Sequence, residues 1–207
     1  MKTLRQNLDD VGFINRETDS SGQTIKYRCG RDFIYYALNC YYPDQYNTHT
    51  KNATWLEKSH SLGISLPWWL MWTQLQFLYL PRFLSKLKLQ LTINGRTIKS
   101  FYSLFITLSI PTRSNVHNKI KEIENAVDNG YASGIDISLG LGGLIDHVLF
   151  VHGYDVSNFY VFDSHQVSKL EYDKMTNDSR YYMKLPKSIV ERRWSKFGRV
   201  WILKKIN

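Results

Sequence analysis

One amphipathic helical pattern followed by three strand-like runs constrains the fold of this chain more than any other feature. In SNVHNKIKEIENAVDNG, Ile120, Ile123 and Val127 recur at helical spacing, and Gly130 follows as a helix-ending residue. The runs YASGIDISL, DHVLFVHGYD and NFYVFDSH come next and are rich in β-prone residues. A helix followed by consecutive strands indicates an antiparallel sheet and the α+β class.

The first half of the chain has a mainly helical pattern. Apolar residues recur at spacings of one, three and four between Gly30 and Tyr42, which predicts a helix that Pro43 ends. The Trp-rich stretch 66–89 is expected to be helical between its prolines. Residues 90–110 then contain Asn94-Gly95, a strong hairpin signal, between β-prone runs, so we expect strands on both sides of it.

The length of 207 residues suits one domain, and the apolar fraction of 43% with 22% charged residues is that of a globular protein. We expect a single domain over residues 1–207 without internal repeats. It would contain a lead-in (1–22), a mainly helical half with a Trp-rich insert (23–112), and a half made of a helix plus the antiparallel sheet (113–207).

The net charge of +9 favours an anionic partner. The sequence has no arginine-rich tract, zinc-finger spacing or aromatic RNA-binding strand, so specific nucleic-acid binding is not expected. Residues 66–88 combine tryptophans with basic residues, which is typical of a membrane-surface segment; a buried helix is the alternative. The residues concerned are Trp68, Trp69, Trp72, Arg82, Lys86 and Lys88.

The two cysteines, Cys29 and Cys40, do not form a disulfide framework. On one helix they would lie about 16 Å apart, beyond disulfide reach. Free thiols suit a reducing compartment, and MKTLRQNLDDVGF has no apolar run typical of a signal peptide. Pro67, Pro81 and polar residues interrupt the most apolar stretch, 64–91, so no transmembrane helix is expected. We therefore expect a cytoplasmic protein.

Cys29 stands just before the apolar helical stripe, where a helix N-terminus stabilises negative charge and so favours a nucleophilic thiolate. A cysteine nucleophile also needs a histidine base and a group that orients it. His147 opens one strand-like run and Asp163 closes the next, so pairing through a turn at 156–158 would bring them together. The alternatives are a buried packing cysteine, a core histidine and a turn-forming aspartate.

These residues carry a resemblance to a known family. YRCGRDFIYYALNCYY resembles the nucleophile helix of papain-like cysteine peptidases, closest to the bacteriocin-processing (double-glycine leader) peptidases and their stand-alone relatives. DHVLFVHGYDVSNFYVFDS is similar to their second signature, in which a His opens a strand and an Asp closes the next. The likeness covers residues 23–42 and 119–164; residues 43–112 are not matched.

The resemblance implies a papain-like fold, in which an N-terminal nucleophile helix packs on a C-terminal antiparallel sheet. It assigns Cys29 as nucleophile, His147 as acid and base, Asp163 as the orienting residue and Gln23, six residues before Cys29, as oxyanion helper. It implies no cofactor and no metal. Arg31-Asp32 departs from the Pro and small residue usual after Cys-Gly, and Ser164 replaces a usual Pro; both departures concern specificity.

The function expected from this resemblance is that of a cysteine peptidase-like hydrolase, which cleaves a peptide or amide bond in a peptide or protein substrate. Three alternatives stay open. The first is a catalytically silent papain-like module that binds a peptide. The second is an acyltransferase with the same Cys-His-Asp chemistry, and the third is a protein that binds a membrane surface or anionic partner through residues 66–88.

Overall fold

The computed structural model describes residues 2–3, 29–43, 80–111, 115–140, 145–163, 173–174, 182–194 and 198–206. Its strands are β1 (Lys2–Thr3), β2 (Leu89–Ile93), β3 (Arg96–Thr97), β4 (Ala132–Gly140), β5 (Ile145–Tyr154), β6 (Asn158–Phe162), β7 (Asp173–Lys174), β8 (Tyr182–Pro186) and β9 (Arg199–Lys205). Its helices are α1 (Cys29–Tyr41), α3 (Leu80–Lys86), α4 (Phe101–Ser109), α5 (Val116–Asp128) and α6 (Lys187–Arg193).

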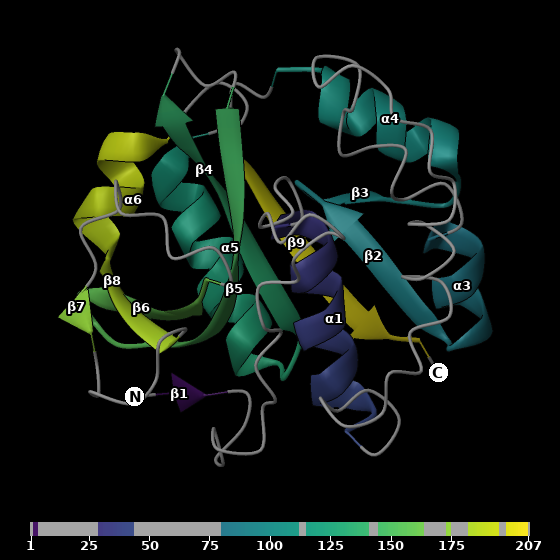
Figure 1. Cartoon of the computed structure of the whole chain (residues 1–207), viewed down its shortest axis with the longest axis horizontal. Helices are drawn as coiled ribbons and strands as arrows, with labels where there is room; N and C mark the ends of the chain where they lie inside the picture. The colour runs from purple at the N-terminus through teal and green to yellow at the C-terminus, as the bar shows by residue number, and fades with distance from the viewer. Residues whose placement is uncertain are drawn as a thin grey trace, which may run out of the picture.

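The described strands form one nine-stranded sheet in the order β3-β2-β9-β4-β5-β6-β8-β7, with β1 paired to β5. Every pair of neighbouring strands is antiparallel. The α+β class expected from the sequence is therefore confirmed. The last strand, β9, lies in the middle of the sheet between β2 and β4 (Figure 1).

Helices cover both faces of this sheet. In Figure 1, α1 crosses the near face and α5 lies behind the strands. Side chains of α1, α3 and α4 form one core cluster with alternate sheet residues such as Phe150 and Trp201. Side chains of α5 and α6 form a second cluster with the intervening residues, such as Ile135 and Val200. The two-residue side-chain period of a strand thus gives the sheet two apolar faces.

Several elements lie where the sequence predicted them. Helix α5 begins after Asn115, whose side chain accepts a hydrogen bond from the backbone N–H of His117 at 2.8 Å. Gly130 ends it with a positive φ of 71°. The predicted hairpin is also present, because Asn94 and Gly95 take positive φ values of 50° and 77° between β2 and β3.

The β-prone run after this hairpin forms a strand only at Arg96–Thr97, and Phe101–Ser109 form helix α4 instead. Ser100 and Ser103 cap α4 reciprocally: the Ser103 N–H donates to the Ser100 hydroxyl at 3.1 Å, and the Ser100 N–H donates to the Ser103 hydroxyl at 3.0 Å. Two satisfied N-terminal donors and the burial of Leu104 outweigh the β-propensity of the aromatic and β-branched residues.

The Trp-rich stretch is described only from Leu80 onwards, and residues 64–79 lie outside the described part. The helix predicted between Pro67 and Pro81 therefore falls almost entirely outside the described part. The described helix α3 begins at Leu80 with Pro81 in its first turn, a position that needs no N–H. Helix α3 ends at Lys86, because Lys88 turns the chain with a φ of 52° and Leu89 begins β2. None of the described helices is long and apolar enough to cross a membrane.

The sheet contains strands from both of the halves into which the sequence was divided. Strands β2 and β3, from the half expected to be mainly helical, belong to the same sheet as β4–β6. Five residue pairs, from Leu89↔Lys205 to Ile93↔Trp201, join β2 to β9. The two halves of the sequence therefore share one sheet.

Candidate active site

Helix α1 places Cys29 at its first residue, buried at the edge of the core. One turn later, Phe33 fixes the helix against the sheet: its ring centroid lies 6.1 Å from that of Phe150 and 5.7 Å from that of Trp201. This close approach requires glycine at position 134 of β4, because a Cβ there would lie 2.7 Å from Phe33 Cδ2. The fit between Phe33 and Gly134 therefore sets the depth at which the thiol is held.

The β5–β6 hairpin brings His147 and Asp163 together. The register pairs Phe150 with Phe162, and Asp163 follows directly after β6. His147 Nε2 lies 2.7 Å from Asp163 Oδ1, and both side chains are almost completely buried. Residues 155–157 connect the two strands, one position earlier than the turn predicted at 156–158.

Cys29 is the third member of this group, because its side chain is a hydrogen-bonding and electrostatic partner of His147. Burial on its own lowers the pKa of His147, but the negative charge and hydrogen bond of Asp163 raise it, and Cys29 adds to that effect. The net result raises the pKa of His147 to about 10. The imidazole therefore carries its proton through the neutral range and can give it to a leaving group.

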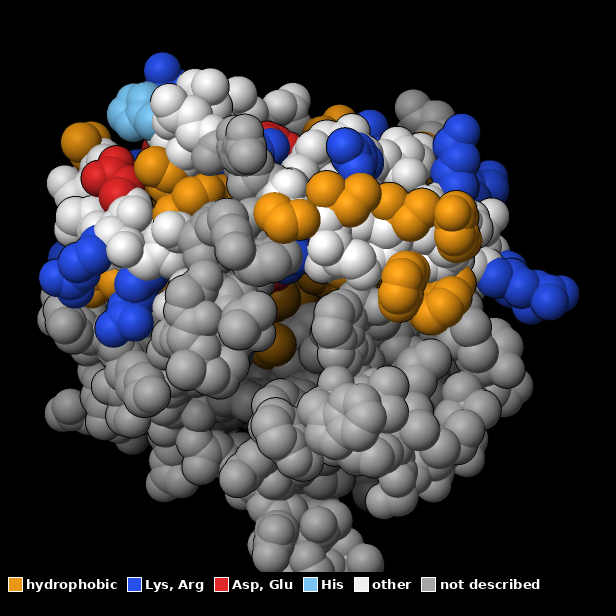
Figure 2. Space-filling view, turned by 90° about the horizontal axis from the view of Figure 1, so that it is seen from above, with side chains coloured by type: hydrophobic (Ala, Val, Ile, Leu, Met, Phe, Trp, Pro, Cys, Tyr) orange, Lys and Arg blue, Asp and Glu red, His pale blue; other side chains and the backbone are white. Residues whose placement is uncertain are grey.

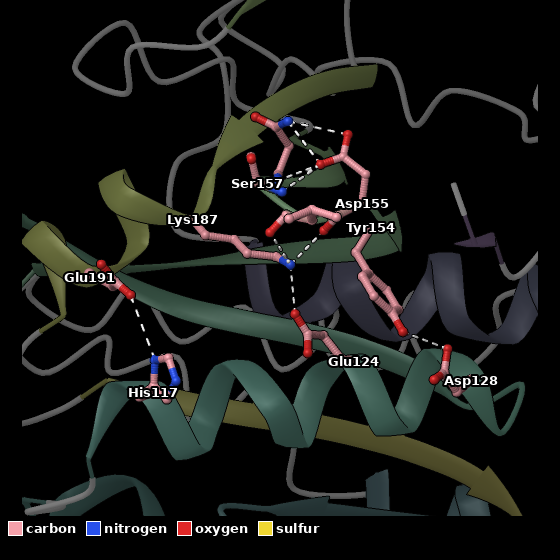
Figure 3. A network of polar contacts seen from close by, with 10 residues as sticks. His117, Glu124, Asp128, Tyr154, Asp155, Ser157, Lys187 and Glu191 are labelled. Carbon is pink, nitrogen blue, oxygen red and sulfur yellow. Dashed lines mark hydrogen bonds and ion pairs between the residues drawn. The ribbon is translucent and has the colours of Figure 1, made fainter.

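A network of polar contacts fixes the turn that sets the register of His147 and Asp163 (Figure 3). Asp155 accepts hydrogen bonds from the backbone N–H groups of Ser157 and Asn158 at 2.8 and 2.7 Å. Lys187, at the start of α6, donates to the Asp155 carbonyl oxygen at 2.5 Å and to Glu124 of α5 at 2.6 Å. The turn is thereby tied to both helices on the α5 face.

A buried ion pair that sequence reasoning missed lies beside this group. Arg199 Nη1 is 3.1 Å from Asp136 Oδ2, and both side chains are buried. Burial raises the pKa of Asp136, whereas Arg199 and, more weakly, the charge of His147 lower it. Arg199 Nη2 also donates to the Leu108 carbonyl oxygen at 2.6 Å, which attaches the end of α4. The available signal was a charged residue inside the apolar run GIDIS and another at the start of RVWIL.

The structure does not place every residue predicted for the site. Gln23 and Ser164 lie outside the described residues, as do the side chains of Arg31 and Asp32. The other buried histidine, His152, lies at an irregularity between Val151 and Gly153 and packs edge-on against Phe162, with centroids 5.6 Å apart. Within the described part of the chain, there is no group of three or more His, Cys, Asp or Glu side chains that could hold a metal ion.

Comparison of the chain with protein-family models, with curated proteins and with solved structures found no significant match.

Proposed function

We propose that this protein is a papain-like cysteine hydrolase that cleaves a peptide or amide bond in a peptide or protein substrate. The observation that carries the proposal is the contact series from Cys29 through His147 to Asp163, at a helix N-terminus and inside a buried environment. A thiol, an imidazole and a carboxylate in that order are the parts of a thiol acyl-transfer site. The sequence likeness to bacteriocin-processing peptidases supports the same proposal.

The mechanism follows from the roles of these groups. The Cys29 thiolate attacks the substrate carbonyl carbon, and a tetrahedral intermediate with a negative oxygen forms. His147 then donates its proton to the leaving amine as the C–N bond breaks, which leaves a thioester on Cys29. His147 next takes a proton from water, whose hydroxyl attacks the thioester; the C–S bond then breaks, which releases the acid and restores the Cys29 thiolate beside the protonated His147. In this scheme the Cys29 N–H and Gln23 hold the oxyanion.

Asp163 is proposed to orient the imidazole. Asp163 Oδ1 lies 2.7 Å from Nε2 of the ring, so Nδ1 is the nitrogen that would exchange a proton with the thiol. Its charge also stabilises the protonated ring, which is the acid that the first half of the reaction needs. The chain keeps this carboxylate beside the imidazole, and the side chains of His147 and Asp163 are both buried. This supports an active enzyme over a catalytically silent binding module.

A thiol-directed electrophilic peptide probe tests the proposal. We expect mass spectrometry to locate the label on Cys29 in the wild type. The labelling rate should fall about a hundredfold or more in His147→Ala. Cys40→Ala is the matched control, since it removes the other thiol of the same helix and should leave the rate unchanged. Undiminished labelling of Cys29 in His147→Ala would show that the thiol is only accessible and would refute the proposal.

A second measurement decides whether water or an amine accepts the acyl group from Cys29. Digestion of a peptide mixture with and without an added primary amine, followed by mass spectrometry, separates the two outcomes. We expect free carboxylate products in both samples. Amide products that appear only with the amine would instead identify an acyltransferase that uses the same three residues.

A further inference from the structure

Helix α4 is apolar on its outer side as well as on its inner side. Leu104 and Thr107 face the core, whereas Tyr102 is 72% exposed and Phe105 and the following Ile110 are each 44% exposed. The helix itself contains no charged residue. Figure 2 shows apolar side chains gathered in a band across this face. A surface helix normally turns polar residues outward, so this face has the character of an interaction site.

Basic residues adjoin the N-terminal end of this helix. Arg96 in β3 and Lys99, next to the N-cap, are both exposed. Lys and Arg side chains lie beside one end of the apolar band in Figure 2. The helix N-terminus adds its own partial positive charge in the same place. We call the exposed residues Arg96, Lys99, Tyr102, Phe105 and Ile110 the α4 surface.

The net charge of the whole chain comes from the stretch of sequence that contains this surface. Between Glu57 and Glu122 every charged residue is Lys or Arg. These residues are Lys58, Arg82, Lys86, Lys88, Arg96, Lys99, Arg113, Lys119 and Lys121. They account for the entire net charge of +9, because acidic and basic residues balance in the remainder. The stretch of sequence that contains the α4 surface is therefore strongly cationic.

We propose that the α4 surface docks onto an anionic lipid bilayer. The exposed aromatic and aliphatic side chains would enter the boundary between headgroups and acyl chains, where tyrosine can keep its hydroxyl in the polar layer. Arg96 and Lys99 would lie at the level of the lipid phosphates. An uncharged helix face with two exposed cations at its N-terminal end complements this layered environment, in which apolar and negatively charged zones are adjacent. The inference does not depend on the proposed hydrolase activity.

Vesicle co-sedimentation of the full chain tests the proposal, with phosphatidylcholine vesicles that contain 30% phosphatidylserine and with pure phosphatidylcholine vesicles. We expect binding to the anionic vesicles at low salt that weakens as salt rises. Tyr102→Ser/Phe105→Ser should reduce the partition coefficient at least tenfold, through lost apolar burial. Arg96→Gln/Lys99→Gln should reduce it by about 25-fold, since each cation contributes about fivefold.

Matched controls use residues far from α4. Val156→Ser removes an apolar side chain that is 94% exposed at the β5–β6 turn, and Lys184→Gln/Arg192→Gln removes two charges from β8 and α6. Both control variants should bind vesicles about as tightly as the wild type and far more tightly than the α4 variants. Thermal melting checks that each variant is folded. If Tyr102→Ser/Phe105→Ser does not fold, Arg96→Gln/Lys99→Gln still tests the proposal. If the wild type does not bind anionic vesicles at low salt, the proposal is overturned. This outcome includes the case in which α4 mediates self-association instead. Equal binding by folded α4 variants and controls would overturn the proposal as well.

Discussion

Replacement of Gly134 by alanine tests how α1 is held against the sheet. The added Cβ would lie 2.7 and 2.8 Å from Phe33 Cδ2 and Cε2, and 3.1 Å from the Leu149 carbonyl oxygen. The Phe33 ring is 1% exposed and lies between Phe150 and Trp201, so it cannot rotate away. The clash must therefore move α1 away from β4.

Overpacking of a filled core costs about 1–3 kcal/mol. We expect about 2 kcal/mol here, because the methyl group meets a closed ring cage on one side and backbone on the other. For a domain of this size that free energy corresponds to a fall in Tm of about 4–8 °C. Urea unfolding should show a lower midpoint at an unchanged m-value. Because α1 also carries Cys29, probe labelling should slow in the folded variant.

Phe33→Leu supplies the control for this experiment. On its own it removes ring atoms and should cost about 1–2 kcal/mol. In the double variant the alanine methyl group has room, so the two costs should fall short of additivity by at least about 1 kcal/mol. A Gly134→Ala protein as stable as the wild type, or costs that add within about 0.3 kcal/mol, would refute the claim that this contact positions the helix.

Three further measurements address the polar groups. Because the pKa of His147 is raised from 6.5 to about 10, its contribution to stability is complete below pH 6.5 and is lost as pH rises towards 10. The free energy of unfolding should therefore fall more steeply over that window in the wild type than in His147→Gln, and equal slopes would contradict the raised pKa. Arg199→Met should cost about 3–5 kcal/mol by leaving Asp136 buried without its ion-pair partner, and Asp136→Asn in the same protein should recover part of it; a urea-measured cost below about 1 kcal/mol would argue against this. Lys187→Met should cost about 1–2 kcal/mol and Lys184→Met much less, because Lys187 alone of the two bridges the β5–β6 turn to Glu124; equal losses in urea unfolding would contradict that bridging role.

The sequence predicted the elements whose signals are local. The stripe in α1, the cap and stop of α5 and the Asn94-Gly95 turn each depend on residues within a few positions of one another. The proximity of His147 and Asp163 was also accessible, because a short hairpin converts sequence separation into spatial contact. The catalytic roles of these residues stay predictions.

Features that depend on distant parts of the chain were not accessible. The position of β9 between β2 and β4 is fixed by packing of both sheet faces, which no single segment encodes. The Asp136–Arg199 pair joins residues 63 positions apart, so neither charged residue predicts its partner from its own segment. At α4, β-prone composition gave the wrong element because a pair of serines and one buried leucine decided the local structure.

The central place of β9 has a consequence for how the protein is made. Of all the described strands, β9 is the last to leave the ribosome, yet β2 and β4 become neighbours of a common strand only when it arrives. Trp201 of β9 is also part of the seat of Phe33. Until that strand is synthesised, α1 has no complete surface on which to settle, and the thiol has no fixed position relative to the imidazole. The complete packing surface of α1, which carries the thiol, therefore forms only after β9 has been synthesised.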